Sequence, residues 1–408
     1  MSPDILTFGC RLNIAESEVM RRLATDTVPD TVVVNTCAVT AEAERQARHA
    51  ISRLHRERPG ARIVVTGCAV QIDPAAWAAL PGVTRVLGNA DKLRPDAWDA
   101  GAPSAVSDIM AVRQAAAHPV VEFAGRTRAF VQVQQGCDHR CTFCVIPFGR
   151  GPSRSVPVGA VVRQVRALVE AGTREVVVTG VDIASYGPDL PGAPTLGGLV
   201  RRVLALVPDL PRLRLSSLDP AADDAELWRL LAEEPRLMPH LHLSLQAGSD
   251  LVLKRMKRRH SRAQALATIA RARALRPGLA VGADLIAGFP TETAAQFAET
   301  LAFVEDAAIP YLHVFPYSER PGTPAARMPP VPKPERRARA AQLRQAGARV
   351  AERFHAAQLG REAMVLAERR GTGHTEHFAP VRLQATAGTL VRARITGFDA
   401  NGLVAEAA

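Results

Sequence analysis

The sequence predicts an α/β chain of three parts: a doubly wound parallel sheet, a partial barrel of six βα units, and a small antiparallel β-barrel. Three observations predict this order. Short β-branched runs alternate with helical stretches over the first hundred residues, a second alternation begins near Arg128, and short runs separated by glycines follow Gly360. We expect the parts to span residues 1–115, 123–355 and 358–408, and a chain of 408 residues is long enough to hold them.

The composition favours a cytoplasmic protein with no membrane partner. Hydrophobic residues make up 47% of the chain, which suffices for ordinary cores, and the longest apolar runs are far too short to span a bilayer. The N-terminus lacks the basic-then-apolar pattern of a signal peptide. The formal net charge of +11 gives moderate support for a nucleic-acid partner. In such a protein, six cysteines are more typical of metal ligands or catalytic groups than of disulfides.

The first part repeats one pattern three times, a short buried strand that ends in cysteine and is followed by a helix. Strands are expected at residues 5–10, 32–37 and 63–68, and helices at 16–23, 41–57 and 74–80. Ligands of parallel sheets bind outside the carboxyl ends of the strands, so Cys10, Cys37 and Cys68 would meet at one edge. A single cysteine there indicates only a small buried residue, but three in the same position favour a metal-cluster site. Asn13 and Asn35 could donate hydrogen bonds around it or cap the following turns.

Three more cysteines follow the first strand of the second part, expected at residues 129–134. Cys137, Cys141 and Cys144 have the spacing C-x3-C-x2-C. Three thiolates within eight residues can bind three irons of a four-iron cluster and leave the fourth iron without a protein ligand. The loop therefore predicts a [4Fe–4S] cluster whose open iron can bind a small molecule.

Five further strands and five helices complete the predicted partial barrel. The strands are expected at 175–179, 213–217, 241–246, 280–286 and 311–315, and the helices at 156–171, 196–206, 225–233, 262–275 and 294–306. Six units are fewer than the eight of a closed barrel. At or near the carboxyl ends of the strands, Asp182, Ser217, Gln246 and Asp284 are candidate contacts to a nucleoside-like cofactor, although each alone fits an ordinary turn. The basic run 254–260 could contact phosphate or a cofactor carboxylate.

A proline-rich run at 329–334 marks a boundary, and a basic helix is expected after it at 335–359. Four short strands follow, at 363–368, 377–383, 389–395 and 403–405, with glycines between them. Small barrels with basic edges often bind single-stranded or looped nucleic acid. Arg382, Arg392 and Arg394 would then contact RNA, and the alternative is a structural cap.

Over nearly its whole length the chain resembles the radical SAM methylthiotransferases. The resemblance rests on the central cysteine loop and on five other motifs, which are Phe8-Gly9-Cys10-Arg11-Leu12-Asn13, Val34-Asn35-Thr36-Cys37, Thr66-Gly67-Cys68, Ser244-Leu245-Gln246-Ala247-Gly248-Ser249 and Gly288-Phe289-Pro290-Thr291-Glu292-Thr293. It implies that the central part is a radical SAM barrel and that the C-terminal part is a TRAM-like barrel. The stretches 35–46 and 136–155 are most similar to the branch that acts on threonylcarbamoyladenosine in tRNA.

The resemblance also implies cofactors, partners and a reaction. Cys137, Cys141 and Cys144 would bind the [4Fe–4S] cluster that cleaves S-adenosyl-L-methionine (SAM), with Asp182, Ser217, Gln246 and Asp284 as candidate SAM contacts. Cys10, Cys37 and Cys68 would bind an auxiliary [4Fe–4S] cluster. The branch places a methylthio group on C2 of the adenine at position 37 of tRNA. The implied partners are a tRNA anticodon stem-loop, an electron donor such as flavodoxin or ferredoxin, and a sulfur donor.

Three alternatives stay open at this point. Two sister branches of the family act on isopentenyladenosine in tRNA or on an aspartate of a ribosomal protein. The third alternative is a zinc-containing RNA-binding protein with His139 as a fourth ligand, although a histidine between two cysteines of a loop is more typical of an exposed side chain.

Overall fold

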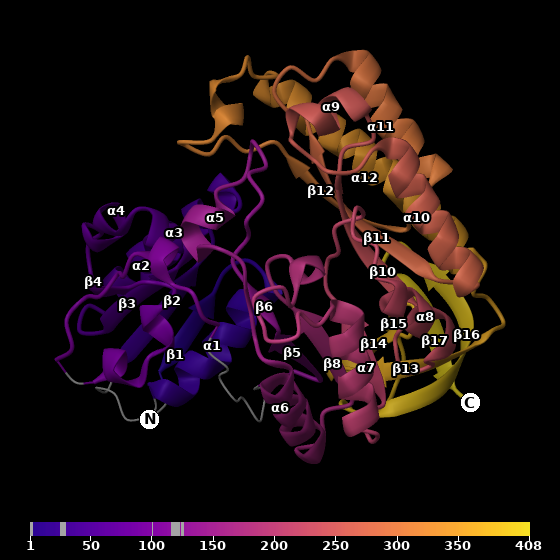
Figure 1. Cartoon of the computed structure of the whole chain (residues 1–408), viewed down its shortest axis with the longest axis horizontal. Helices are drawn as coiled ribbons and strands as arrows, with labels where there is room; N and C mark the ends of the chain where they lie inside the picture. Colours follow the sequence, from indigo (N-terminus) through magenta and orange to yellow (C-terminus); the bar gives the residue numbers. More distant parts are fainter. Residues whose placement is uncertain (1–2, 25–29, 100, 116–122, 124–125) are drawn as a thin grey trace.

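Four parallel strands form the N-terminal sheet, in the order β1–β2–β3–β4 (Figure 1). The structure is a computed structural model and describes residues 3–24, 30–99, 101–115, 123 and 126–408. The strands are β1 (Asp4–Thr7), β2 (Thr31–Thr36), β3 (Arg62–Gly67) and β4 (Val83–Leu87). Every residue of β2 is buried, as its unbroken β-branched run requires in a sheet covered on both sides.

Helices cover both faces of this sheet, which confirms the predicted fold class. The helices are α1 (Arg11–Leu23), α2 (Ala41–Glu57), α3 (Cys68–Ile72) and α4 (Pro74–Ala78). Val34 and Val65 pack against Ile51 of α2, whereas Val33 on the other face belongs to one cluster with Met20 of α1. Helix α1 begins directly after Cys10, ahead of the start expected at residue 16. Strand β4 and helix α3 were not predicted, because both are short and carry little periodic signal.

Six parallel strands form the central partial barrel, as predicted. They are β5 (Arg128–Gln132), β8 (Glu175–Thr179), β9 (Arg212–Leu215), β10 (His240–Gln246), β11 (Ala280–Ala287) and β12 (Tyr311–Pro316). Two sheets, β5–β8–β9 and β10–β11–β12, meet where the amide of Leu218 donates to the carbonyl of His242 (2.8 Å) and the amide of Ser244 donates to the carbonyl of Leu218 (2.9 Å). The barrel stays open between β5 and β12, which are not paired with each other.

Helices enclose the outside of this barrel. The long ones are α6 (Val158–Glu170), α7 (Leu196–Leu206), α8 (Ala225–Glu233), α10 (Arg262–Leu275), α11 (Ala294–Asp306) and α12 (Lys333–Ala356). The short helices α5 (Ile146–Arg150) and α9 (Asp250–Arg255), and the strands β6 (Gln134–Gln135) and β7 (Arg154–Ser155), lie around the cysteine loop. Among the described residues, no helix combines the length and the apolar character needed to cross a membrane.

The C-terminal barrel is closed and has five strands rather than the four expected from the sequence. Its order is β13 (Glu362–Ala367), β14 (Thr372–Thr375), β15 (Pro380–Arg382), β17 (Gly402–Ala407) and β16 (Leu390–Asp399). Strand β14 reads Thr-Gly-His-Thr, which has no apolar alternation to reveal it. Its glycine is needed, because a Cβ on Gly373 would lie 2.5 Å from the carbonyl oxygen of Leu366. The pairing of β15 with β17 is parallel, and the other four pairings are antiparallel.

The C-terminal barrel seals the amino-terminal end of the central strands (Figure 1). Arg214 donates to the carbonyl of Glu376 (3.2 Å) and, through two nitrogens at 2.9 and 3.1 Å, to the carboxylate of Glu175. Burial alone would raise the pKa of Glu175, but Arg214 holds it at about 2. The ring of Phe378 lies 4.8 Å from the guanidinium carbon of Arg214 and 5.0 Å from that of Arg128.

Removing the side chain of Arg214 should therefore destabilise the folded protein. Glu175 and Arg214 have side chains that are 0% exposed, so Arg214→Ala leaves a buried carboxylate without its main partner. We expect a loss of about 3–5 kcal/mol in the free energy of unfolding, measured by urea denaturation. In the matched control Arg94→Ala, the lost partner of Asp96 is 61% exposed, and the expected loss is far smaller because solvent screens the pair. Equal losses in the two variants would contradict this account of the seal.

Candidate active site

The central cysteine loop runs from β6 to α5 and is fastened at both ends. Gly136 has φ +69°, and a Cβ there would lie 1.9 Å from the carbonyl oxygen of Pro152, so only glycine allows the chain to leave β6 in this way. Within the loop, Thr142 donates from its amide to the carbonyl of Met256 (3.1 Å) and from its hydroxyl to that of Arg255 (2.8 Å). The loop is therefore held against the end of α9.

The thiols of this loop are free and partly exposed. Burial raises the pKa of Cys137 to about 12 and that of Cys144 to about 11, although each also receives a backbone hydrogen bond. Negative thiolates are thus disfavoured here unless a positive centre compensates them. A metal cluster provides that compensation, and thiolate sulfur is the donor that iron–sulfur clusters require.

The other three cysteines lie at the carboxyl edge of the N-terminal sheet. Cys10 is the N-cap of α1, Cys37 follows β2, and Cys68 is the first residue of α3. A Cβ on Gly9 would lie 2.6 Å from the sulfur of Cys37, and Gly9 has φ +94°, so a glycine lets the first two cysteine segments approach each other. Burial raises the pKa of Cys37 to about 12, and the nearby thiols of Cys68 and Cys10 raise it further. All three thiols are free.

The two sets of cysteines are neighbours. Burial raises the pKa of Cys144, and Cys68 of the other set contributes to the same shift. If a Cβ were added to Gly149, in α5 after the central loop, it would lie 3.2 Å from the Cβ of Cys68. Two neighbouring sets of three free thiols provide the donor atoms that two iron–sulfur clusters would require.

A buried ionic network joins the two sets. Arg150, at the end of α5, donates through Nε to the sulfur of Cys68 (3.1 Å) and through its other nitrogens to Glu16 and Asn13 of α1. Lys92 donates to the second oxygen of Glu16 at 2.7 Å. The side chains of Glu16, Lys92 and Arg150 are at most 2% exposed.

The network explains the two asparagines beside the cysteines. Asn13 donates to the backbone carbonyls of Phe8 (2.7 Å) and Thr36 (3.0 Å), and Asn35 donates to the carbonyl of Asn13 (3.0 Å). Both side chains are completely buried. They therefore tie the strand ends together and do not cap the helices.

The four candidate SAM contacts do not occupy equivalent positions. Asp182 follows β8, and its carboxylate lies 2.9 Å from Nε2 of His139, with the sulfur of Cys137 within 4.8 Å of both. Ser217 follows β9, and Gln246 ends β10 in the left-handed region, with φ +69°. Asp284 instead lies in the middle of β11, away from the strand end, between His242 (3.0 Å) and His313 (3.2 Å).

The central strands give the barrel an apolar outside and a polar lumen. On β10, Leu241, Leu243 and Leu245 pack into the core under the helices, so the alternate residues His240, His242, Ser244 and Gln246 face inward. On β11, the glycine at 282 leaves room for His242, since a Cβ there would lie 2.5 Å from Nδ1 of that ring. The strict alternation of His-Leu-His-Leu-Ser-Leu-Gln was a signal for this lumen that the sequence analysis did not use.

One arginine of the basic run 254–260 reaches the cysteine loop. Arg258 lies 3.6 Å from the sulfur of Cys141 and donates to the carboxylate of Asp219 (3.1 Å) and to the carbonyl of Ser244 (2.8 Å). Its side chain is 8% exposed. From sequence, the run could contact phosphate or a cofactor carboxylate, and nothing in its composition distinguishes Arg258 from its neighbours.

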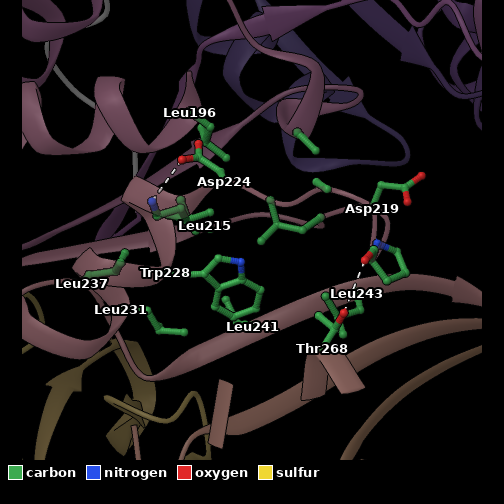
Figure 2. Close-up of a pocket in the computed structure, with 15 residues that line it drawn as sticks. Leu196, Leu215, Asp219, Asp224, Trp228, Leu231, Leu237, Leu241, Leu243 and Thr268 are labelled. Carbon is green, nitrogen blue, oxygen red and sulfur yellow. Dashed lines mark hydrogen bonds between the residues drawn. The ribbon is translucent and has the colours of Figure 1, made fainter. Parts of the chain in front are cut away.

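A separate apolar cavity lies on the outside of the barrel, at the junction of β9 and β10 (Figure 2). Leu215, Leu241 and Leu243 of the strands face Trp228 and Leu231 of α8 across it. Figure 2 shows that the carboxylate of Asp219 points away from this cavity. Because the leucines belong to the outer face of the strands, the cavity is part of the packing under the helices and is distinct from the cysteine site.

A three-cysteine loop at the carboxyl end of an open six-stranded barrel defines the class of radical SAM enzymes. The family profile described as the Radical SAM superfamily matches residues 131–304, and that described as Uncharacterized protein family UPF0004 matches residues 4–88. In fold, the chain is similar to the radical SAM methyltransferase TsrM of Kitasatospora setae, with a TM-score of 0.54 and 17% identity, covering 78% of this chain and 66% of that one.

Sequence relatives identify a narrower family within the radical SAM enzymes. The chain is 48% identical to threonylcarbamoyladenosine tRNA methylthiotransferase MtaB of Rickettsia prowazekii, over 97% of this chain and 95% of that protein. It is 37% identical to tRNA-2-methylthio-N(6)-dimethylallyladenosine synthase of Erythrobacter litoralis, over 90% of this chain and 86% of that protein. The chain belongs to the radical SAM methylthiotransferase family, as its sequence motifs predicted. It is therefore an enzyme, and the prediction of a zinc-containing RNA-binding protein is set aside.

The ionic network makes stability depend on pH. Burial would raise the pKa of Glu16, but Arg150 and Lys92 lower it from 4.5 to about 2. The stabilisation by this carboxylate is therefore fully present above about pH 4.5 and is lost as the pH falls through about 2. It amounts to about 3 kcal/mol, measured as the difference in unfolding free energy between pH 5 and pH 2 in the reduced, cluster-free chain.

The variant Glu16→Gln tests this assignment. We expect it to be less stable than the parent at pH 7 by about 3–5 kcal/mol, because Lys92 and Arg150 lose their shared anion. Between pH 5 and pH 2 it should lose about 3 kcal/mol less stability than the parent, because Glu175, whose pKa is also about 2, still titrates in both proteins. Glu18→Gln on the same helix is the control, since its partner Arg21 is 35% exposed. If Glu16→Gln kept the full acid dependence of the parent, Glu16 would not be its source.

Proposed function

We propose that this enzyme inserts a methylthio group at C2 of N6-threonylcarbamoyladenosine at position 37 of tRNA. The observation that carries the proposal is the meeting of two three-cysteine sets at one buried network, in a chain 48% identical to a protein named for that tRNA substrate. One set suits the generation of a radical from SAM, and the second provides an independent place for the sulfur.

The cysteines would hold the two cofactors. Cys137, Cys141 and Cys144 would bind the radical SAM [4Fe–4S] cluster, and Cys10, Cys37 and Cys68 would bind an auxiliary [4Fe–4S] cluster. When bound, these clusters supply one-electron cleavage of SAM and the sulfur that is transferred. In support of this division, the second set lies at the edge of a different sheet from the first and is matched by a different family profile.

The chain's own residues would position and compensate these groups. Arg150 donates to the sulfur of Cys68 at 3.1 Å, and Arg258 lies 3.6 Å from the sulfur of Cys141, so each cysteine set has a guanidinium beside it. The glycines at 9 and 136 let the loops approach without steric conflict. Asp182, Ser217 and Gln246 lie at or just beyond the carboxyl ends of strands and are proposed to contact SAM. Asp284, the fourth candidate, lies in the middle of β11 between His242 and His313, so we propose that it contacts the substrate instead of SAM.

The proposed macromolecular partner is the tRNA anticodon stem-loop. The chain has a formal net charge of +11, and Arg392 and Arg394 are exposed on β16. Arg382 pairs with Asp399 at 2.7 Å and Arg392 pairs with Glu362 at 3.6 Å, and both side chains are still exposed. The reaction also needs an electron donor, such as flavodoxin or ferredoxin, and a sulfur donor, and the cytoplasm is the proposed location for such an enzyme.

One other substrate has a specific observation in its favour. The relative in Erythrobacter litoralis is named for dimethylallyladenosine, that is, isopentenyladenosine, and is 37% identical to this chain. Its identity is lower than the 48% of the threonylcarbamoyladenosine relative, so we place it second. No comparable observation favours the aspartate of a ribosomal protein.

Nucleoside mass spectrometry decides between these substrates. tRNA from a strain that lacks this gene, and has no second enzyme for the reaction, should lose 2-methylthio-threonylcarbamoyladenosine and retain its isopentenyl counterpart. A complementing copy of the gene should restore the lost nucleoside. Loss of the isopentenyl derivative alone would reverse the order of the two substrates.

Two cysteine variants should separate the roles of the two sets. Cys141→Ala should abolish SAM cleavage, because the loop then keeps only two of its three cysteine ligands and no longer binds the cluster. Cys37→Ala should retain SAM cleavage, form no methylthio product and contain roughly half of the iron of the parent. The measurements are 5′-deoxyadenosine release, nucleoside product and iron content in anaerobically reconstituted protein. Full methylthio product from Cys37→Ala would remove the case for the auxiliary cluster.

A further inference from the structure

The lumen of the central barrel contains a guanidinium with no anionic partner. Arg11 is partly buried. Its guanidinium carbon lies 5.7 Å from the centroid of the Phe378 ring, over the face of that ring. It has no ion pair and no hydrogen bond among the described residues. A cation withdrawn from water in this way is costly unless an anion completes the site.

The neighbouring arginines show that Arg11 is the exception. Arg128 pairs with Glu368 at 3.0 Å, and Arg214 pairs with Glu175 at 2.9 Å. Each of these two guanidiniums already has a carboxylate partner. The guanidiniums of Arg11, Arg128 and Arg214 all lie near the ring of Phe378, so three cations share only two carboxylates, those of Glu368 and Glu175. Three guanidiniums and only two carboxylates leave this cluster with excess positive charge, which would stabilise an anion added beside Arg11.

The position of Arg11 links this cation to the reaction site. Arg11 is the first residue of α1 and directly follows Cys10. Ala15, one turn later on the same helix face, packs into the core of the central barrel with Phe130 of β5. The side chain of Arg11 therefore projects across the open edge of the barrel, from the segment that carries a proposed cluster ligand.

A second polar group lies within electrostatic range of Arg11. The carboxylate of Asp284, one of the charges that act on Arg11, lies 3.0 Å from Nε2 of His242 and 3.2 Å from Nδ1 of His313. The donor and acceptor atoms of these three residues lie within 4.8 Å of one another. They present a compact set of hydrogen-bonding groups in the lumen, where a hydroxyl or an amide can be held from several sides.

We propose that Arg11 binds the carboxylate of the substituent on N6 of the target adenine, and that His242, Asp284 and His313 hold the hydroxyl and amide groups of the same substituent. The inference rests on the proposed function and names how the substrate is recognised. A threonine joined through its nitrogen to a carbonyl on N6 keeps a free carboxylate and a free hydroxyl, whereas an isopentenyl group has neither. Arg11 would then determine specificity for an acidic substituent.

The test compares three anticodon stem-loops that differ only in the N6 group: the threonylcarbamoyl acid, its neutral threonine amide, and isopentenyl. Binding to reconstituted enzyme is measured by fluorescence anisotropy. The unaltered enzyme should bind the acid about tenfold more tightly than the amide, since a hydrogen-bonded charge pair contributes roughly that factor. Arg11→Gln should bind the acid about tenfold more weakly and the amide with unchanged affinity, so that the preference disappears.

The controls separate this site from other anion sites. Arg22→Gln, at the far end of the same helix, should keep the full preference for the acid. Iron content shows whether the substitution beside Cys10 has altered cluster loading. If Arg11 instead bound RNA phosphate, Arg11→Gln would weaken all three RNAs equally, and that result would overturn the inference.

The outcomes also distinguish the inference from the proposed function. An enzyme that methylthiolates the threonylcarbamoyl RNA but binds acid and amide equally would overturn the role of Arg11 and leave the substrate intact, and this comparison needs no variant. An Arg11→Gln enzyme that retains the preference for the acid would do the same. An unaltered enzyme that forms no methylthio product on the acid RNA would instead refute the proposed function.

Discussion

The buried pairing of Arg150 with Glu16 is the interaction on which the rest of the active site depends. Arg150 comes from the helix after the central cysteine loop, and Glu16 comes from the helix after Cys10. Two cations and one anion have been removed from water there, so separating the N-terminal sheet from the barrel would leave charges buried without partners. The same guanidinium contacts Cys68, so the force that joins the two parts also fixes one set of cysteines against the other.

The central barrel beside this junction has apolar side chains on its outside and polar side chains in its lumen. Its leucines point outward under the helices, where they supply the hydrophobic core, and its histidines, glutamine and serine point inward. An open barrel with a polar lumen needs a seal at one end, and the C-terminal barrel provides it through Phe378 and the buried Arg214–Glu175 pair. The amino ends of the strands are therefore covered by the C-terminal barrel, and the cysteines lie at the opposite, carboxyl end.

The sequence predicted what local pattern and residue type determine. Helices α2, α7, α8, α10 and α11 have the predicted bounds, because caps and apolar periods are local signals. The six cysteines stand out by chemistry and spacing. Strand β14 could not be predicted, because it has no apolar alternation. The roles of Arg150, Arg258 and His313 could not be predicted either, because each depends on a partner in another element, 82, 117 and 29 residues away in the sequence. An arginine in a sequence rich in arginine carries no sign of which one is buried.

The start of α1 unites the two functions that the enzyme must combine. Cys10 is the N-cap of α1 and has an extended backbone, whereas Arg11 is the first helical residue. The side chains of these two adjacent residues therefore point in different directions. Burial raises the pKa of Cys10, the charge of Arg150 lowers it and the nearby thiol of Cys68 raises it, while the guanidinium of Arg11 lies 5.7 Å from the ring of Phe378. Chemistry and recognition are thereby set by one rigid element. A shift of α1 would move both residues together, so the proposed cluster ligand and the proposed substrate contact stay at a fixed distance from each other.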